Sequence, residues 1–103
     1  MSSDQGANQA TEKLEEVQLR LFVSGATPRS LRAIAAIHNL CETRLAGRYR
    51  FEVVDAYQHP EAARAAGVVA LPTLLQLAPG PKRLFIGDLS DTAPIKAGLG
   101  LAG

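Results

Sequence analysis

The segment from residue 68 to residue 91 constrains the fold of this chain more than any other part. It holds two apolar runs, 68–77 and 84–86, with a turn rich in proline and glycine between them. Apolar runs of this length, bounded by turn residues, predict two buried strands joined as a hairpin. Pro72 lies inside the first run, although proline has no N–H to donate to a neighbouring strand. We therefore expect Pro72 at the first residue of a strand, at a sheet edge or in a cis peptide.

The residues before this segment predict a strand, a helix and a second strand. In 18–24 and in 49–55, every second side chain is apolar, which is typical of a strand with one buried face. Between these strands, Thr27 is a good N-cap and Pro28 suits the first position of a helix. Two strands with a helix between them predict a right-handed βαβ unit in which the strands are parallel.

The helix that begins at Pro28 is expected to bury one apolar stripe. Gly47 is expected to end this helix in a left-handed conformation, and a second, short helix is expected between Pro60 and Gly67. The stripe follows spacings of three and four residues, and its members are Leu31, Ile34, Ala35, His38, Cys41 and Leu45, widened by Ile37 and Leu40.

The end of the chain gives the weakest local signal. Ser90 or Asp91 could cap a last helix that has Pro94 in its first turn. Gly98 and Gly100 oppose that helix, since each glycine costs about 1 kcal/mol relative to alanine in a helix interior. The C-terminal segment therefore has no strong local preference.

Length and composition limit the possible functions. The 103 residues suit one domain, and a net charge of +1 gives no electrostatic reason to bind nucleic acid. No apolar run approaches the ~20 residues that cross a bilayer, so no membrane partner is predicted. Residues 1–16 lack the apolar core of a signal peptide and are expected to be a disordered tail before a folded domain over 17–103. The single cysteine, Cys41, excludes an internal disulfide and indicates the cytoplasm.

The expected elements follow the order of a thioredoxin-like α/β fold, in which βαβ is followed by αββα. In redox proteins of that fold, a cysteine pair lies at the start of the first helix, where the helix N-terminus lowers the thiol pKa. Here 24–28 contains no cysteine, and Cys41 lies deep in the helix on its apolar stripe, as a structural thiol would. A thioredoxin-like redox enzyme or a glutathione-binding protein is therefore only the alternative function.

Other groups that could carry chemistry have simpler explanations. His38 and Cys41 could be two metal ligands, but no third or fourth ligand accompanies them, and His59 is expected in a loop. His38 is instead expected to be a partly buried histidine. No cofactor and no metal are predicted. Ser24 lacks a base at a suitable spacing for a hydrolase. Asp55 and Asp88 are better explained as turn or cap residues than as an acid pair.

Two arginines at the start of the first helix oppose the helix macrodipole. Arg29 and Arg32 there cost a few tenths of a kcal/mol each. That cost indicates either a surface for an acidic partner or a solvated face. Arg48 and Arg50, at the start of the second strand, add to the case for a partner.

Five segments, in order and at matching spacing, resemble the KaiB family of clock proteins. The resemblance runs from about Leu19 to Leu101, and the five segments are 21–30, 53–55, 59–60, 70–74 and 86–91. It implies a non-enzymatic binding module. KaiB proteins bind the N-terminal ring of KaiC, a RecA-like ATPase and autokinase. In cyanobacteria they then sequester KaiA and displace the histidine kinase SasA.

The resemblance also implies a change of fold. KaiB proteins have a βαβ half that is followed either by βααβ, in a tetramer, or by αββα, in a thioredoxin-like monomer that binds KaiC. We therefore expect a homo-oligomer, a dimer or tetramer, at rest and a monomer in the complex. A KaiB-like stress-response adaptor without a true clock is a further alternative. A third alternative is an isolated sensor domain that resembles the SasA N-terminus, and the lack of a kinase segment after Gly103 argues against it.

The resemblance assigns expected roles to seven residues. Arg50, Gln76 and Arg83 are expected to contact the partner. Family members often carry lysine near Gly67, Gln76 and Glu52, and an acid near Gly100, so the contact surface is expected to differ in this chain. The residues expected to shape the switch are Pro72, Gly87, Asp88 and Gly98.

Overall fold

The chain folds around a four-stranded sheet in the order β2-β1-β3-β4. The structure is a computed structural model that describes residues 16–101. In its first half, β1 (Val17–Val23) pairs in parallel with β2 (Tyr49–Asp55). In its second half, β3 (Thr73–Ala78) pairs antiparallel with both β1 and β4 (Arg83–Ile86). The predicted βαβ unit and hairpin are confirmed, whereas residues 1–15 of the predicted tail lie outside the described residues. The prediction that both hairpin strands are buried is wrong for β4, three of whose four residues are exposed, and β3 begins at Thr73 rather than at residue 68.

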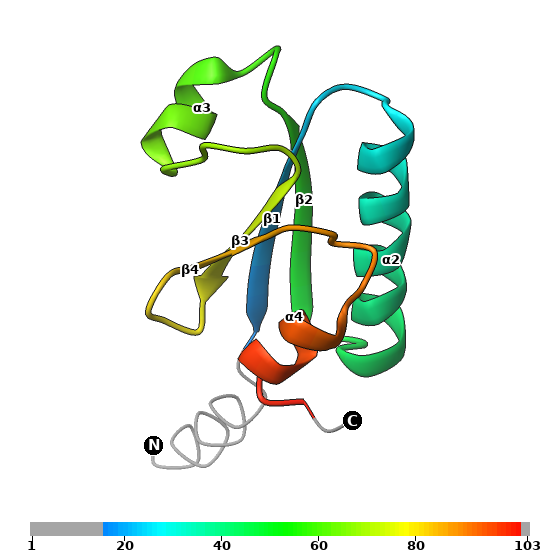
Figure 1. The fold of residues 1–103 in the computed structure, drawn as a ribbon. Helices are drawn as coiled ribbons and strands as arrows, with labels where there is room; N and C mark the ends of the chain where they lie inside the picture. Colours follow the sequence, from blue (N-terminus) through cyan, green and yellow to red (C-terminus); the bar gives the residue numbers. More distant parts are fainter. Residues whose placement is uncertain (1–15, 102–103) are drawn as a thin grey trace.

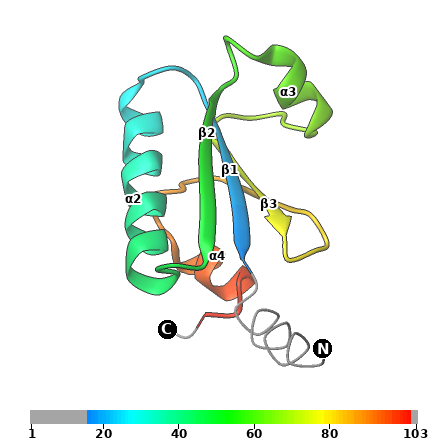
Figure 2. The ribbon, with the colours of Figure 1, turned by 180° about the vertical axis from the view of Figure 1, so that it is seen from behind.

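Three helices flank the sheet, which Figure 1 shows edge-on between α2 and α3. They are α2 (Pro28–Arg44), α3 (Pro60–Ala65) and α4 (Ala93–Gly98). The view from behind in Figure 2 again places α2 and α3 on opposite sides of the sheet and α4 at the lower end. The element order βαβ-αββα is that of the thioredoxin-like α/β fold, as predicted. No helix within residues 16–101 is long and apolar enough to span a bilayer.

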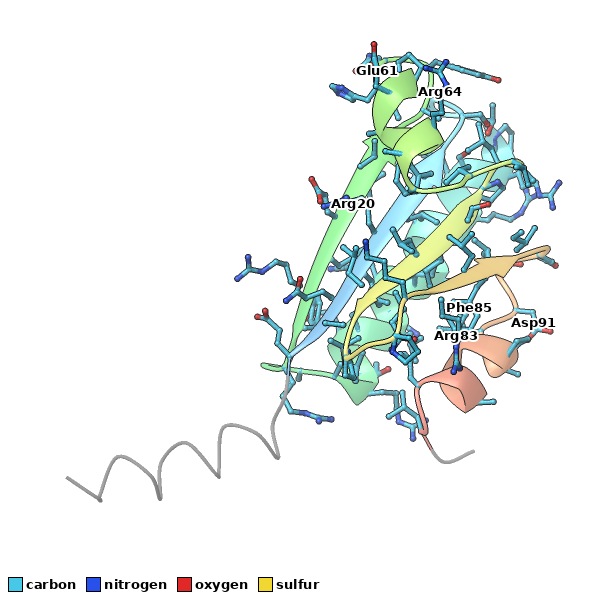
Figure 3. All side chains as sticks on the ribbon, turned by 90° about the vertical axis from the view of Figure 1, so that its left-hand side faces the viewer. Arg20, Glu61, Arg64, Arg83, Phe85 and Asp91 are labelled. Atoms are coloured by element: carbon cyan, nitrogen blue, oxygen red, sulfur yellow. The ribbon has the colours of Figure 1, made fainter. Side chains whose placement is uncertain are left out.

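Each face of the sheet has its own apolar core. On one face, Leu19 and Leu21 of β1 pack with Ile37 of α2 and Ile95 of α4. On the other face, a smaller cluster around Phe22 lies under α3. Figure 3 looks onto this second face, where no helix of residues 16–101 covers the sheet below α3. The larger core therefore joins α2 and α4, which come from the two halves of the chain.

The start of α2 confirms the predicted cap. The Thr27 hydroxyl accepts a hydrogen bond from the Ser30 N–H, and Pro28 occupies the first helical position. Gly47 has a φ of 76°, as expected for the left-handed residue after the helix. The second short helix, α3, also begins at Pro60 as predicted, and Gly67 follows it with a φ of 79°.

The buried stripe of α2 is rotated from the predicted one. Leu31 is 51% exposed and His38 is also exposed, so the prediction of a partly buried His38 is wrong. Four polar side chains share the exposed face of the helix, so the predicted stripe lies too near that face; they are Arg32, Asn39, Glu42 and Thr43. The residues of α2 that the sheet covers are Ser30, Ala33, Ile37, Leu40 and Cys41.

Two further details differ from the sequence predictions. Val53 of β2 is 42% exposed and Val54 is buried, because β2 is an edge strand whose other face lies near α3. The N-cap of α4 is Thr92 rather than Ser90 or Asp91. Asp91 still contributes, since its Oδ1 accepts a hydrogen bond of 3.2 Å from the Ala93 N–H.

Candidate functional site

The predicted site residues do not form one cluster, and Arg50 lies alone. It is exposed on β2, the edge strand farthest from β4. Its Nε lies 3.6 Å from Glu16 Oε1 in an ion pair that is open to solvent. Exposed pairs of this kind contribute about 0–1 kcal/mol to stability. The Arg50 guanidinium is therefore available to a partner at little structural cost.

Arg83 and Gly98 come together where β4 meets α4. Arg83 Nη1 donates a hydrogen bond of 3.0 Å to the carbonyl of Gly98, the last residue of α4. Figure 3 shows Arg83 and Phe85 at the side of α4. A β-carbon on Gly98 would lie 2.7 Å from two carbons of the Phe85 ring, so this close approach needs glycine. The sequence reasoning missed Phe85, for which the only signal was its place in the apolar run of β4.

Gly87 and Asp88 lie next to the start of α2. Arg29 Nη2 donates a hydrogen bond of 3.3 Å to the Gly87 carbonyl. Asp88 Oδ1 accepts hydrogen bonds from the hydroxyl and the N–H of Ser90, which confirms its predicted role in a turn. These bonds to Ser90 lower the pKa of Asp88, and the charges of Arg29 and Arg32 lower it further. The two arginines thus have an acidic neighbour within the chain.

Pro72 lies directly before β3, after a cis peptide bond to Leu71. Its side chain is buried. Of the alternatives for this proline, the cis peptide is therefore the one that describes it, since the first residue of the strand is Thr73. Gln76, four residues further on, is only 6% exposed, so in this arrangement its side chain offers a partner almost no surface.

The place of the redox cysteines in thioredoxin-like enzymes holds hydroxyl groups here. The Thr27 hydroxyl donates a hydrogen bond of 2.9 Å to the Ser30 hydroxyl, and the Ser30 oxygen also accepts one of 3.1 Å from the Ser24 N–H. These bonds fix the loop before α2. The loop has no cysteine, so it lacks the thiol that disulfide exchange requires at this position.

The two histidines and the cysteine do not share a site in the described part of the chain. His38 Nε2 is 3.9 Å from Glu42 Oε2, and His59 is exposed at the start of α3. Within residues 16–101, no three His, Cys, Asp or Glu side chains come together in a way that could hold a metal ion.

Asp55 accepts a hydrogen bond from the Tyr57 N–H at 2.9 Å, which confirms its predicted turn role.

Cys41 is fully buried, and burial raises the pKa of its thiol from 9.0 to about 11. We expect Ellman's reagent at pH 8 to label it slowly in the native protein and rapidly in urea. The unfolded thiol ionises near pH 9 and the folded one near pH 11, so stability should fall as pH rises through this window. Cys41→Ala should flatten that part of the pH profile. Rapid labelling of the native protein would contradict the burial.

The fold is similar to that of several solved thioredoxin-like structures. The N-terminal domain of Synechococcus elongatus SasA has a TM-score of 0.68 at 21% identity, over 86% of this chain and 89% of that one. Fasciola hepatica thioredoxin has a TM-score of 0.66 at 17% identity, over 90% of this chain and 89% of that one. Identities this low establish a shared fold and say nothing of shared chemistry.

Sequence similarity is higher to one family. The circadian clock oscillator protein KaiB of Picosynechococcus sp. is 42% identical over 83 residues, which cover 81% of this chain and 80% of that protein. The KaiB of Parasynechococcus marenigrum is 41% identical with the same coverage. The family model of the KaiB domain matches residues 20–101, which include every element from α2 to α4 and most of β1. This chain therefore belongs to the KaiB family.

Proposed function

We propose that this chain is a non-enzymatic clock or timer protein that binds a KaiC-type RecA-like ATPase and modulates its phosphorylation cycle. The observation that carries the proposal is the 42% identity over 83 residues to a circadian clock oscillator protein KaiB. A buried cysteine and a thiol-free loop before α2 also favour binding over redox chemistry. KaiA or a SasA-like histidine kinase would be further partners where the organism has them.

We place the partner contacts on the exposed cations of the sheet. Arg50 on β2 and Arg83 on β4 are both exposed. Arg83 also donates to the Gly98 carbonyl, so changes there disturb α4 as well as the surface. Among the described residues Arg50 makes only the weak pair with Glu16, so it is the cleaner residue to test.

We further propose that the C-terminal half switches between αββα and βααβ, with an oligomer in the second state. Two of its features favour such a change. Its helices, α3 and α4, have six residues each and no side-chain hydrogen bond at either N-cap. Helices shorter than about 12 residues are marginal on their own in water, so these two depend on their tertiary contacts. Gly98 lies at such a contact, beside Arg83 and Phe85. Gly87 and Asp88 lie in the connection between β4 and α4.

The test is a time course of binding to the KaiC homologue of the same organism, with ATP or with ADP. Size-exclusion chromatography with light scattering should show a complex that grows over minutes to hours as a larger free species disappears. Rapid binding by a monomer would keep the adaptor role and remove the slow switch. Absence of a complex with both nucleotides would overturn the proposal.

A charge reversal tests the contact surface in the same assay. Arg50→Glu should weaken the complex at least tenfold without changing the urea midpoint, because Arg50 is exposed and makes no strong contact. Arg64→Glu, on the exposed side of α3, is the matched control. Equal weakening by both variants would point to a general charge effect rather than to a contact at β2.

A further inference from the structure

Gln76 stands out in the interior of the sheet. Its side chain is 6% exposed, and its Oε1 is the one fully buried side-chain oxygen or nitrogen within residues 16–101 that lacks a hydrogen-bond partner. On β3, Gln76 is paired with Leu19 of β1 on one side and with Arg83 of β4 on the other. It shares a face of the sheet with Leu74, which belongs to the core between the sheet and α2 and α4. A polar amide therefore occupies a position of the apolar core.

The other end of the amide fixes its orientation. Gln76 Nε2 donates a hydrogen bond of 3.0 Å to the Pro79 carbonyl, in the turn between β3 and β4. Turning the amide over would bring two oxygens together at Pro79 and would leave the N–H groups in the position that lacks a partner. Either orientation leaves one polar atom unsatisfied. The unpaired Oε1 is thus a property of the site and not of the way the amide is turned.

An unpaired buried oxygen weakens the state that buries it. In the unfolded chain water satisfies this carbonyl, and in the folded chain no protein group within residues 16–101 replaces that bond. One such unpaired group usually lowers the folding equilibrium constant by about 5- to 150-fold. This free-energy cost of the unpaired oxygen arises when β3 lies between β1 and β4 beneath the C-terminal segment. It therefore bears on the arrangement of the C-terminal half rather than on the βαβ half.

We infer that Gln76 holds the thioredoxin-like arrangement below the stability that the same backbone would have with an apolar side chain. The amide supports the turn through Pro79 and at the same time penalises full insertion of β3. The C-terminal half is thereby kept able to leave this arrangement. This last step rests on the proposed change of fold, whereas the effect of Gln76 on stability does not.

The test replaces the amide with an apolar side chain of similar length. Gln76→Met should raise the folding equilibrium constant of the thioredoxin-like monomer, separated from larger species by size-exclusion chromatography, by about fivefold or more in urea denaturation, with an unchanged m-value. The matched control is Gln18→Met on β1, a glutamine that is half-buried and has no orphaned atom. Its equilibrium constant should change less than that of Gln76→Met.

Two results would overturn the inference. If Gln76→Met is no more stable than the parent, the amide is satisfied or its bond to Pro79 outweighs the orphaned oxygen. If Gln76→Met is more stable but binds the KaiC homologue with an unchanged time course, Gln76 does not govern the change of fold. The stability measurement needs no partner, so it decides the first point even if KaiC binding fails.

Discussion

Ile37→Ala is expected to lower the free energy of unfolding by about 2–5 kcal/mol. Ile37 is 0% exposed and packs in the core between α2 and the sheet, so its truncation leaves a cavity beneath the helix. Urea denaturation, with the midpoint and m-value fitted together, measures the change. Because the βαβ half is common to both proposed arrangements, the loss should appear whichever one the C-terminal half adopts.

Leu31→Ala is the control for the rotation of α2. Leu31 is 51% exposed, so its truncation should cost less than about 1 kcal/mol. The apolar pattern of the helix alone would place Leu31 at the core and predict a large loss. Equal losses from Leu31→Ala and Ile37→Ala would mean that α2 meets the sheet with a different face.

Ile95→Ala is expected to cost about 2–5 kcal/mol and to act on the C-terminal half. Ile95 is 1% exposed and is the only fully buried residue of α4, so it provides most of the apolar contact that holds this short helix. If the thioredoxin-like arrangement is the one that binds KaiC, the variant should form the complex at least tenfold less well. Binding assays and urea denaturation on the same sample measure both effects.

Lys96→Ala is the matched control on the same helix. Lys96 is half-buried and outside the core, so its truncation should change stability by less than about 1 kcal/mol and leave binding intact. A strong loss of binding by Lys96→Ala would place a partner contact on α4. Unchanged binding by a destabilised Ile95→Ala would separate KaiC binding from the docking of α4.

The βαβ half was predictable because its signals are local. Thr27 and Pro28 mark the start of α2, and the bounds of β2 follow the alternation over 49–55. The predicted stripe of α2 lies too near Leu31, because Leu31 and Ile37 are equally apolar when each is taken alone. The polar side chains of Arg32, Asn39 and Thr43 mark the exposed face and leave Ile37 on the buried one.

The contacts of the candidate site were less predictable, because they join distant residues. The sequence singled out Arg83 and Gly98 separately, and the hydrogen bond between them depends on how α4 docks beside β4. The burial of Gln76 was also hidden, since a single glutamine in an apolar strand could face either side. Local patterns indicate which residues are unusual, and the topology decides which of them meet.

The strand order has a consequence for any rearrangement of the second half. β1 lies between β2 and β3, and five of its seven residues are buried. Removal of β3 would open a row of unpaired N–H and C=O groups along an apolar strand, which is the template for edge-to-edge aggregation. A replacement strand must therefore arrive as β3 leaves, from elsewhere in the chain or from another molecule. In the second case, the speed of the rearrangement would depend on protein concentration, and the amount of this protein in the cell would itself help to set the delay.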